Sequence, residues 1–446
     1  MRAITDSITI FALSSGRGRA GVAVIRVSGT GARDVLERLA GGVPEPRQAA
    51  LRPLRDPQTD ELLDQALVLF FAAPASFTGE DIAELHIHGG PAVLDGVISA
   101  LGRMEGLRGA EPGEFARRAF ANHKLDLTQA EGLADLIEAE TQVQRRQALR
   151  QSGGDLRGLC EAWRDNVIHA AALVEAALDF SDEADVPALV EGQARPVVET
   201  LRASLLRHLD DAHKGERLRE GLQVVLAGAA NAGKSSLLNA LSRRDAAIVS
   251  REPGTTRDVI EVHLDLGGYP VTLIDTAGLR EASGEVEQEG MKRTFTRAGQ
   301  ADLVVWLIDG TDPQWQPPGG LTAQENNVLL VFNKADLAQC DDAHSDALSI
   351  SAKTGEGLDS LIGLLAERAA EMMEAGEPAV VTRARQRLEL EICRDALGAF
   401  LEGAPHELEL RAEDLRVAAR ALGRVTGSVD VEDVLDRIFG DFCIGK

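Results

Sequence analysis

The sequence predicts a multidomain protein in which α/β domains are combined with an all-α domain. Three observations indicate this fold class. The chain has 446 residues, which is enough for two or three domains with separate cores. Short apolar runs alternate with helical patterns in residues 1–118 and again in residues 216–375. Residues 119–215 and 376–446, in contrast, show helical spacing only.

The first predicted domain, residues 1–118, is a small α/β domain. Its last apolar run alternates apolar and polar residues, as a half-buried strand does. His86 and His88 share one face of that strand. No cysteine or obvious third ligand is near them, so we interpret them as ordinary strand residues and not as a metal site. Strands are expected at 21–27, 65–71 and 83–88, and helices at 32–39 and 92–101.

The second predicted domain is helical and consists of the two flanks 119–215 and 376–446. Thr128–Glu131 fits a capping box at a helix start. Further helices are expected around 156–179 and 193–219. We expect the two flanks to pack together, so that residues 216–375 form an inserted domain whose ends lie close to each other.

Apolar stripes predict that the second flank is helical from Arg383 to Ile438. The stripe residues are Leu388, Ile392, Leu397, Leu415, Ala418, Ala419 and Leu422.

The inserted domain opens with a phosphate-binding motif. Residues Gly228–Ser235 match G-x-x-x-x-G-K-[ST] between a predicted strand at 224–227 and a predicted helix at 236–241, which is the context that the motif requires. Lys234 is expected to reach the β- and γ-phosphates, and Ser235 to ligate Mg²⁺. The nucleotide-binding residues predicted here are Asn231, Ala232, Gly233, Lys234, Ser235 and Ser236.

Three further motifs follow in the order that a GTPase needs. One apolar strand ends in D-x-x-G, another ends in N-K-x-D, and a third segment is similar to the loop that closes over the base. The Asp336 carboxylate can accept two N–H bonds from guanine, whereas adenine lacks that donor pair. The sequence therefore predicts a P-loop, Ras-like GTPase domain. The motif residues are Asp275, Thr276, Ala277, Gly278, Asn333, Lys334, Asp336, Ser351 and Ala352.

A polar segment, Gly254–Asp258, precedes a predicted strand at 260–264. A threonine in such a switch loop supplies a second protein ligand to Mg²⁺ and senses the γ-phosphate. We assign this role to Thr256. The alternative is a turn whose hydroxyls are solvated.

The residue after D-T-A-G is Leu279, where Ras-like GTPases place a glutamine that orients the attacking water. Leucine cannot orient water, so another group must act or the chain only binds the nucleotide. Glu281, Glu285 and Glu287 follow in a polar segment, and each could hold the water. For any one of them, a solvated acidic loop is the alternative.

The composition indicates a soluble, cytoplasmic protein with reduced thiols. A formal net charge of −24 disfavours unaided binding to a polyanion. The sequence shows no signal peptide and no long apolar run, so we expect no membrane association. The four cysteines have no C-x-x-C spacing, and Cys443 is the one that could be reactive.

Over nearly its whole length the sequence resembles the MnmE (TrmE) family of tRNA-modifying GTPases. The resemblance depends on motifs within the GTPase core and outside it, and few of the latter occur in other GTPases. The matching segments besides the phosphate loop and N-K-x-D are Ser76–Asp81, His88–Pro91, Pro112–Phe115, Lys124–Glu131, Asp275–Ala282 and Cys443–Lys446.

The resemblance implies an N-terminal α/β domain that forms a homodimer and binds formyl-tetrahydrofolate, the suspected one-carbon donor. It also implies a heterotetramer with MnmG (GidA), a partner that uses flavin and NADH. Together they would add a (carboxymethyl)aminomethyl group at C5 of the wobble uridine of certain tRNAs. The family's folate contacts fall on Arg26, Glu84, Lys124 and Lys446.

A potassium mechanism is also implied by the resemblance. The GTPase domains of the dimer would meet across a K⁺ ion that stands where an arginine finger stands elsewhere. The family's water-positioning carboxylate falls on Glu287, and Ser250 and Thr255 also fall on nucleotide contacts. The implied K⁺ ligands are Asn231, Ser250, Glu252 and Thr255.

The sequence departs from the family pattern at two places. Ala229–Ala230 replaces the usual Arg-Pro, at positions that offer only backbone groups to phosphate, so phosphate binding should survive with a less rigid loop. The glycine-rich turn at residues 14–21 is slightly altered and one residue longer than usual.

Two other functions share some of these motifs. A ribosome-assembly GTPase would need an RNA-binding module, and the sequence has no basic G-X-X-G segment and no basic tail. A folate-binding regulatory protein with incidental GTPase activity would leave wobble uridine unchanged, which mass analysis of tRNA would reveal.

Overall fold

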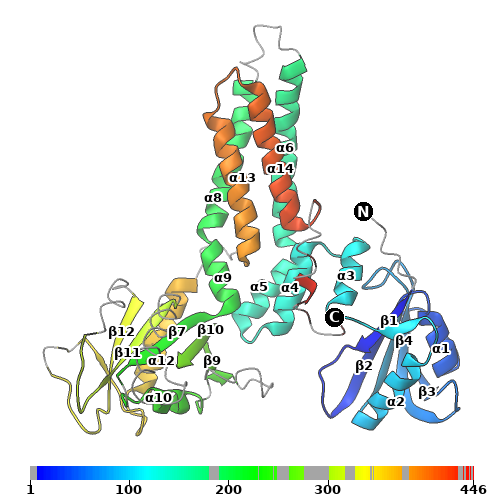
Figure 1. The fold of residues 1–446 in the computed structure, drawn as a ribbon, viewed down its shortest axis with the longest axis horizontal. Coiled ribbons are helices and arrows are strands. Elements are labelled where there is room, and N and C mark those ends of the chain that lie inside the picture. Colours follow the sequence, from blue (N-terminus) through cyan, green and yellow to red (C-terminus); the bar gives the residue numbers. More distant parts are fainter. Residues whose placement is uncertain are drawn as a thin grey trace, which may run out of the picture. The chain divides into compact units, whose positions relative to one another are not determined.

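The computed structural model describes residues 8–179, 190–229, 231–244, 246–248, 261–275, 301–316, 327–341, 344, 346–373, 381–429, 435, 438–440, 442 and 445. Contacts divide the chain into two compact units. Unit 1 contains residues 1–134, 152–165 and 419–446, and unit 2 contains residues 135–151 and 166–418. Figure 1 shows the elements of both units.

Unit 1 is built on a six-stranded sheet in the order β3-β4-β5-β2-β1-β6. The strands pair antiparallel except β1 and β6, which pair parallel. The element bounds are β1 Thr9–Leu13, β2 Ala20–Ser28, α1 Ala32–Ala40, β3 Ala50–Arg55, β4 Leu62–Phe71, β5 Ile82–Gly89, α2 Pro91–Gly102, β6 Leu107–Gly109 and α3 Glu114–Ala121.

The core of unit 1 lies on one face of this sheet, under α1 and α2. Ile25 and Leu85 from the strands pack with Leu36 of α1 and Leu101 of α2, and all four side chains are fully buried. All the predicted strands and helices of this domain are present with nearly the predicted bounds. The sequence analysis missed β1, β3, β6 and α3, because these elements are short or have only a few buried positions.

Four of the described helices have residues in both units. They are α4 Leu127–Glu138, α5 Gln142–Gly153, α6 Asp155–Asp179 and, near the other end of the chain, α14 Leu408–Thr426. The capping-box prediction for α4 was wrong by two residues. Asp126 Oδ1 accepts from Gln129 N at 2.8 Å, and Gln129 Oε1 accepts from Asp126 N at 3.1 Å, so Asp126 and Gln129 form the reciprocal pair. Thr128 instead donates to Asp126 Oδ1.

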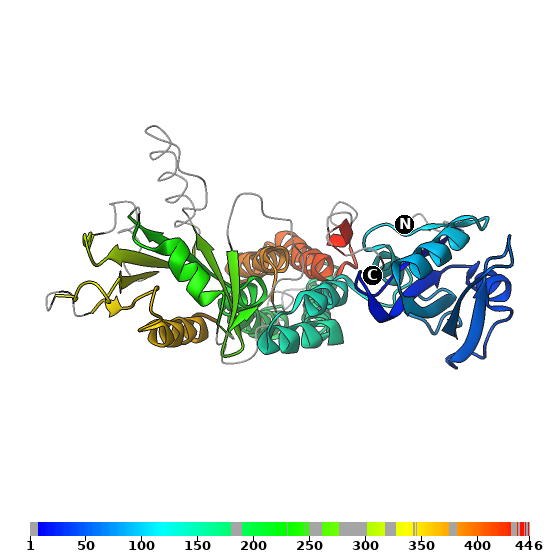
Figure 2. The same ribbon diagram turned by 90° about the horizontal axis from the view of Figure 1, so that it is seen from below.

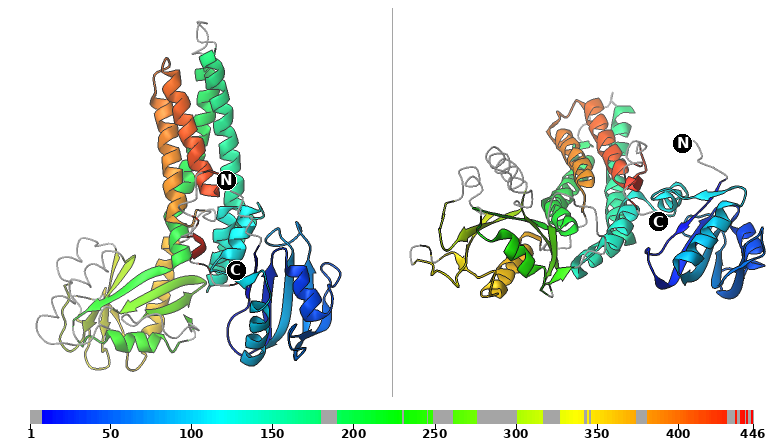
Figure 3. Two further views of the ribbon diagram at one scale, coloured as in Figure 1. Left: turned by 45° about the vertical axis from the view of Figure 1, so that its right-hand side comes forward. Right: turned by 60° about the horizontal axis from the view of Figure 1, so that its bottom comes forward.

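The helical part of unit 2 includes a short π-helix at Val190–Ala194, α8 Arg195–Asp210, α9 Ala212–Glu220 and α13 Ala384–Glu402. Helix α8 belongs to the first flank and α13 to the second. They run side by side, as we expected of the two flanks (Figures 1 and 3). Among the described helices, none is long and apolar enough to span a membrane.

The predicted apolar stripe of α13 was partly wrong. Leu388 is 53% exposed and Ile392 is 40% exposed, whereas Leu390, Cys393 and Leu397 are buried. The buried face includes Gln386, whose Oε1 accepts from Thr382 N at 3.0 Å. A search for apolar residues does not count a buried glutamine, so the predicted stripe missed one position of the buried face of α13. On α14, Leu415, Ala418 and Leu422 are buried as predicted, and Ala419 is only half-buried.

The rest of unit 2 is a seven-stranded sheet in the order β13-β12-β11-β7-β10-β9-β8. Strands β13, β12, β11, β7 and β10 are parallel, and β9 and β8 extend the sheet with antiparallel pairing. The element bounds are β7 Leu222–Gly228, α10 Lys234–Leu241, β8 Ala247–Ile248, β9 Glu261–Leu266, β10 Tyr269–Asp275, β11 Leu303–Asp309, β12 Val328–Asn333, β13 Leu348–Ser349 and α12 Leu358–Met373.

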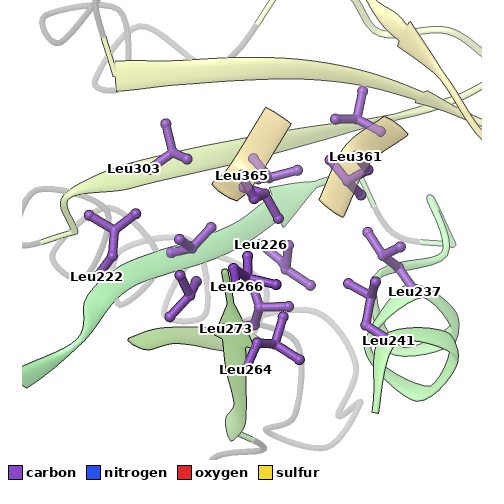
Figure 4. Close-up of a cluster of buried hydrophobic side chains, with 14 of the residues drawn as sticks. Leu222, Leu226, Leu237, Leu241, Leu264, Leu266, Leu273, Leu303, Leu361 and Leu365 are labelled. Carbon is purple, nitrogen blue, oxygen red and sulfur yellow. The ribbon is translucent and has the colours of Figure 1, made fainter. Parts of the chain in front are cut away.

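Helices α10 and α12 cover one face of this sheet (Figure 2). Figure 4 shows Leu237 and Leu241 of α10 and Leu361 and Leu365 of α12 packed around Leu226 of β7. These leucines are almost fully buried, so the helix that begins at Lys234 is held firmly against the central strand.

Candidate functional site

Four neighbouring parallel strands of the second sheet end in polar or glycine residues at one edge. Strand β7 ends at Gly228, β10 at Asp275, β11 at Asp309 and β12 at Asn333. Parallel pairing brings these carboxyl ends to the same edge, where open α/β sheets bind ligands. The candidate site is therefore assembled by the fold from segments more than a hundred residues apart.

The loop from Gly228 to Gly233 has a backbone that side chains would not permit. Gly228 has φ +152°, and a Cβ there would lie 2.3 Å from the Leu307 carbonyl oxygen. Gly233 has φ +97°, and a Cβ there would lie 2.3 Å from Asn333 Nδ2. Asn231 also has a positive φ, +64°. The two glycines of the motif are thus required by conformation and by close neighbours.

The Lys234 ammonium binds to the backbone of this loop. Its Nζ donates to the carbonyl oxygens of Gly228 at 2.9 Å and Ala229 at 2.8 Å, and the residue is only 8% exposed. Burial lowers the pKa of Lys234, and the nearby Asp275 carboxylate opposes that shift. A buried cation at the first residue of α10, where the helix N-terminus presents unpaired N–H groups, is suited to a phosphate anion.

Ser235 and Asp275 offer the oxygen ligands that Mg²⁺ prefers. Ser235 Oγ donates to Asp275 Oδ2 at 3.0 Å, and Asp275 is buried. A hydroxyl and a carboxylate beside a phosphate-binding loop fit a Mg²⁺ ion that also contacts phosphate oxygens. Ser236 follows on the exposed side of α10.

The N-K-x-D motif is held by the loop after β13. Asp336 Oδ1 accepts from Ser351 Oγ at 2.7 Å, and Ser351 is fully buried. Ser351 Oγ also accepts from Thr354 N at 3.2 Å, which fixes the turn that carries Ala352. Within the described part of the chain, Asp336 Oδ2 makes no hydrogen bond, so it could accept from a guanine N–H donor.

Asn333 connects the phosphate loop to the base loop. Its Nδ2 donates to Ala232 O at 2.8 Å, and its Oδ1 accepts from Ala352 N at 3.0 Å. Asn333 is 2% exposed. One side chain therefore ties together the two predicted halves of the nucleotide site.

Asp309 is a site residue that the sequence analysis missed. Its Oδ2 accepts from Lys334 Nζ at 2.6 Å, and its Oδ1 accepts from Thr311 N and Thr311 Oγ1. Burial alone would raise the pKa of Asp309, but the bonds from Lys334 and Thr311 hold that pKa below its ordinary value. The sequence feature that could have indicated Asp309 is an apolar strand that ends in Asp-Gly, and the structure shows that this strand is fully buried.

Several predicted site residues lie outside the described part of the chain. They are Ser250, Glu252, Thr255, Thr256, Thr276, Ala277, Gly278 and Glu287 of the GTPase domain, and Lys446.

The predicted folate contacts Arg26 and Glu84 meet in unit 1. They are direct cross-strand partners of β2 and β5, and Arg26 Nε and Nη2 donate to Glu84 Oε1 at 3.1 and 3.0 Å. The Arg26 guanidinium also lies over the rings of Phe77 and Phe115. Lys124 is exposed, and its stem lies beside Gly79, within 3.4 Å of where a Cβ would stand.

The C-terminal segment reaches the same part of unit 1. Ser14 Oγ donates to Gly445 O at 2.9 Å, and a Cβ on Gly445 would lie 2.1 Å from the Leu13 carbonyl oxygen. Ser14 lies in the turn that follows β1, next to the strand that carries Arg26.

The two strand histidines contact carboxylates. His86 Nε2 lies 3.2 Å from Glu84 Oε2, and His88 Nδ1 lies 2.8 Å from Asp64 Oδ1. Within the described residues, no group of three or more His, Cys, Asp or Glu side chains is placed to hold a metal ion.

Comparisons with known proteins match nearly the whole chain. A model described as the MnmE helical domain matches residues 127–443, and one described as the GTP-binding protein TrmE N-terminus matches residues 9–124. A tRNA modification GTPase MnmE of Parvibaculum lavamentivorans is 54% identical over 443 residues, which cover 98% of this chain and 100% of the relative. The protein of the same name from Methylobacterium sp. is 54% identical and covers 98% of this chain and 99% of the relative.

Similar solved structures include two G domains of the iron transporter FeoB. That of T. maritima is 29% identical, covers 34% of this chain and 99% of its own, and has a TM-score of 0.26. That of Methanococcus jannaschii is 22% identical, covers 34% and 97%, and has a TM-score of 0.26.

Proposed function

Since the chain belongs to the MnmE family of tRNA modification GTPases, we propose that it uses GTP hydrolysis to drive a modification at C5 of the wobble uridine of certain tRNAs. The proposed partner is MnmG (GidA), which supplies flavin and NADH chemistry, and the proposed product carries a (carboxymethyl)aminomethyl group. The observation that carries this proposal is 54% identity along essentially the entire chain, together with a nucleotide site of the form described above. We place the protein in the cytoplasm.

The domain division proposed for this activity is 1–118, 119–215 with 376–446, and 216–375. The structural support for an inserted GTPase domain lies where the chain enters and leaves the second sheet. Arg219 precedes β7, and Arg383 follows the last helix of that sheet. Both donate to Asp135 Oδ1, at 3.1 and 2.6 Å, so the two connections lie together.

When GTP and Mg²⁺ are bound, Mg²⁺ neutralises phosphate charge, and the residues of this chain position the nucleotide. Lys234 would hold the β- and γ-phosphates, Ser235 would ligate the ion, and Asp336 would select guanine. Ser351 restrains Asp336 by a hydrogen bond, so this carboxylate is oriented before the base arrives. Thr256 is the proposed second ligand to Mg²⁺.

For catalysis we propose K⁺ and Glu287 in place of the missing glutamine. Asn231 is exposed on the rim of the phosphate loop in a left-handed conformation, so its side chain is accessible to an ion and to a second GTPase domain. The other proposed K⁺ ligands are Ser250, Glu252 and Thr255. Glu287 would orient the attacking water as the two GTPase domains meet.

A formyl-tetrahydrofolate site at Arg26, Glu84, Lys124 and Lys446 is proposed in unit 1. Arg26 is held by a carboxylate and two aromatic rings, an arrangement that fits a flat, polar heterocycle with attached carboxylates. The contact between Gly445 and Ser14 brings the chain end to this region, which supports a role for Lys446.

The homodimer is proposed to form through the sheet face of unit 1 that α1 and α2 leave uncovered. Leu51 and Leu67 are direct partners on β3 and β4, and they are 65% and 46% exposed. Paired exposed leucines on a sheet are the kind of surface that a second copy of the chain covers.

Mass analysis of tRNA tests the proposed function. In a strain lacking this chain, the C5-modified wobble uridine should disappear, and wild-type protein should restore it. Lys234→Ala protein should fail to restore it, because the phosphates lose their buried cation. Unchanged wobble uridine in the deletion strain would contradict the proposal. Co-purification with tagged protein should recover the MnmG partner.

A further inference from the structure

Helix α5, Gln142–Gly153, contains three arginines and no acidic residue. The whole chain, in contrast, has a formal net charge of −24. Such a charge repels a polyanion, so a protein of this composition that acts on RNA must gather cations on a local surface. Helix α5 is therefore a candidate for a surface that contacts RNA phosphates.

The three arginines of α5 lie on the side of the helix that faces solvent. Because successive residues of a helix are about 100° apart, Arg145, Arg146 and Arg150 fall within a sector of about 140°. Arg145 and Arg146 are exposed, and Arg150 is half-buried. Ala148 and Gln151 lie outside this sector and are buried. The exposed side of α5 is thus cationic and free of carboxylates along its length.

The buried side of α5 fixes the helix in place. Gln151 Oε1 accepts from Thr382 Oγ1 at 2.7 Å, and Gln144 Nε2 donates to Arg219 O at 3.0 Å. At the start of the helix, Thr141 Oγ1 accepts from Gln144 N at 3.3 Å. The arginines therefore project from a backbone that is held near both of its ends, which lowers the entropy cost of binding a partner.

Two of the α5 arginines have no carboxylate partner. Arg145 Nε donates to the neutral Gln142 Oε1 at 3.1 Å, and among the described residues neither Arg145 nor Arg146 forms an ion pair. Exposed arginines on several other helices do form ion pairs with a carboxylate one turn away. Examples are Arg38 with Asp34, Arg157 with Glu161 and Arg416 with Glu413. The charges of Arg145 and Arg146 are thus available to an anion from outside the chain.

We propose that the α5 arginine face, formed by Arg145, Arg146 and Arg150, binds the phosphate backbone of tRNA. Arg146 and Arg150 are one turn apart, about 6 Å along the helix axis, so the face can contact neighbouring phosphates of one strand. Contacts of this kind position the RNA and do not read its sequence. The proposal rests on the proposed action of the chain on tRNA and names the surface that holds this substrate.

The salt dependence of tRNA binding to the full chain tests the proposal. Binding would be followed by the fluorescence anisotropy of a labelled tRNA transcript over a range of salt concentrations. Each phosphate contact adds about 0.7–0.9 to the steepness with which log affinity falls against log salt concentration. Arg145→Gln with Arg146→Gln should therefore reduce that steepness by about 1.4–1.8, and should lower the affinity at about 0.1 M salt by about 25- to 60-fold.

Two further double variants separate charge from structure. Arg145→Lys with Arg146→Lys keeps both charges and should keep most of the salt dependence. Arg38→Gln with Arg416→Gln is the matched control, because it removes two exposed arginines that already have carboxylate partners, and it should bind tRNA as the wild type does. GTP hydrolysis without tRNA should be unchanged in all three variants, which shows that the nucleotide site remains folded.

A wild-type salt dependence in Arg145→Gln with Arg146→Gln would overturn the proposal, and so would an equal loss in the control. Wild-type protein that binds vesicles of anionic phospholipid but not tRNA would overturn it too. The wobble uridine of the deletion strain is measured separately, so the proposed function can stand where the assignment of this surface fails.

Discussion

Replacing Asn333 by alanine should weaken nucleotide binding by removing the tie between the phosphate loop and the base loop. The side chain is 2% exposed and satisfies the Ala232 carbonyl at 2.8 Å and the Ala352 N–H at 3.0 Å. Ala232 is fully buried, so its carbonyl cannot turn to water, whereas Ala352 is half-buried and can recover part of its hydrogen bonding. Leaving one buried polar group unsatisfied costs about 1–3 kcal/mol.

In the variant, nucleotide binding has to order the phosphate loop and the base loop that Asn333 holds in the wild type. The free-energy cost of the lost hydrogen bonds therefore appears as weaker nucleotide affinity. One to three kcal/mol corresponds to about 5- to 150-fold. The assay is an equilibrium fluorescence titration with a labelled GDP, repeated by competition with inorganic triphosphate, which has no base. Both ligands should weaken, because the phosphate loop itself is loosened. Thermal unfolding of the variant checks that the domain remains folded.

A second variant, Asn333→Asp, tests the same two hydrogen bonds. It keeps an acceptor for Ala352 N–H but places an oxygen against the Ala232 carbonyl, so it should bind triphosphate at least as weakly as the alanine variant. Triphosphate affinity within twofold of wild type in Asn333→Ala would refute the reasoning, since Asn333 would then act only on the base.

Three other predictions follow from the site and the core. Asn231→Ala should abolish K⁺ stimulation of GTP hydrolysis with little change in GDP affinity, and equal hydrolysis rates in Na⁺ and K⁺ for the wild type would contradict the ion mechanism. Glu287→Ala should lower kcat by about 10²–10⁴-fold with little change in affinity, while Glu285→Ala should be mild; the reverse order would move the role away from Glu287. Burial raises the pKa of the Cys393 thiol to about 12, so this thiol should resist iodoacetamide at pH 8 until urea unfolds the chain, and rapid labelling of the native protein would contradict its buried placement.

The nucleotide site was largely predictable because its motifs are local. A glycine loop, a lysine and a following helix need only consecutive residues. In the structure Lys234 lies against the carbonyl oxygen of Gly228 and Ser235 bonds to Asp275. Their roles toward phosphate and Mg²⁺ stay predictions. Asp309 was missed because its role depends on pairing. It lies opposite Asn333 in the register of β11 and β12, beside Lys334, and no pattern within β11 indicates which strand is its neighbour.

Other features could not be predicted for a similar reason. Arg26 and Glu84 were both predicted as folate contacts, but they are 58 residues apart in sequence, and the sheet order that makes them partners could not be derived from strand propensity. Gln386 lies in the core of α13 because Thr382 bonds to it, which an apolar count cannot show. Asp126 caps α4 although Thr128 fits the capping pattern as well, because the helix begins at Leu127, directly after Asp126.

Coupling between GTP hydrolysis and tRNA modification is the central claim, and a change of nucleotide specificity tests it most directly. Asp336→Asn should weaken GTP binding and favour xanthosine triphosphate, whose base offers an oxygen where guanine has its amino group. In a reconstituted reaction with tRNA and the MnmG partner, wobble-uridine modification by this variant should then require xanthosine triphosphate and fail with GTP, while the wild type shows the opposite preference. Modification that proceeds equally with GTP, with xanthosine triphosphate or with no nucleotide would contradict the account.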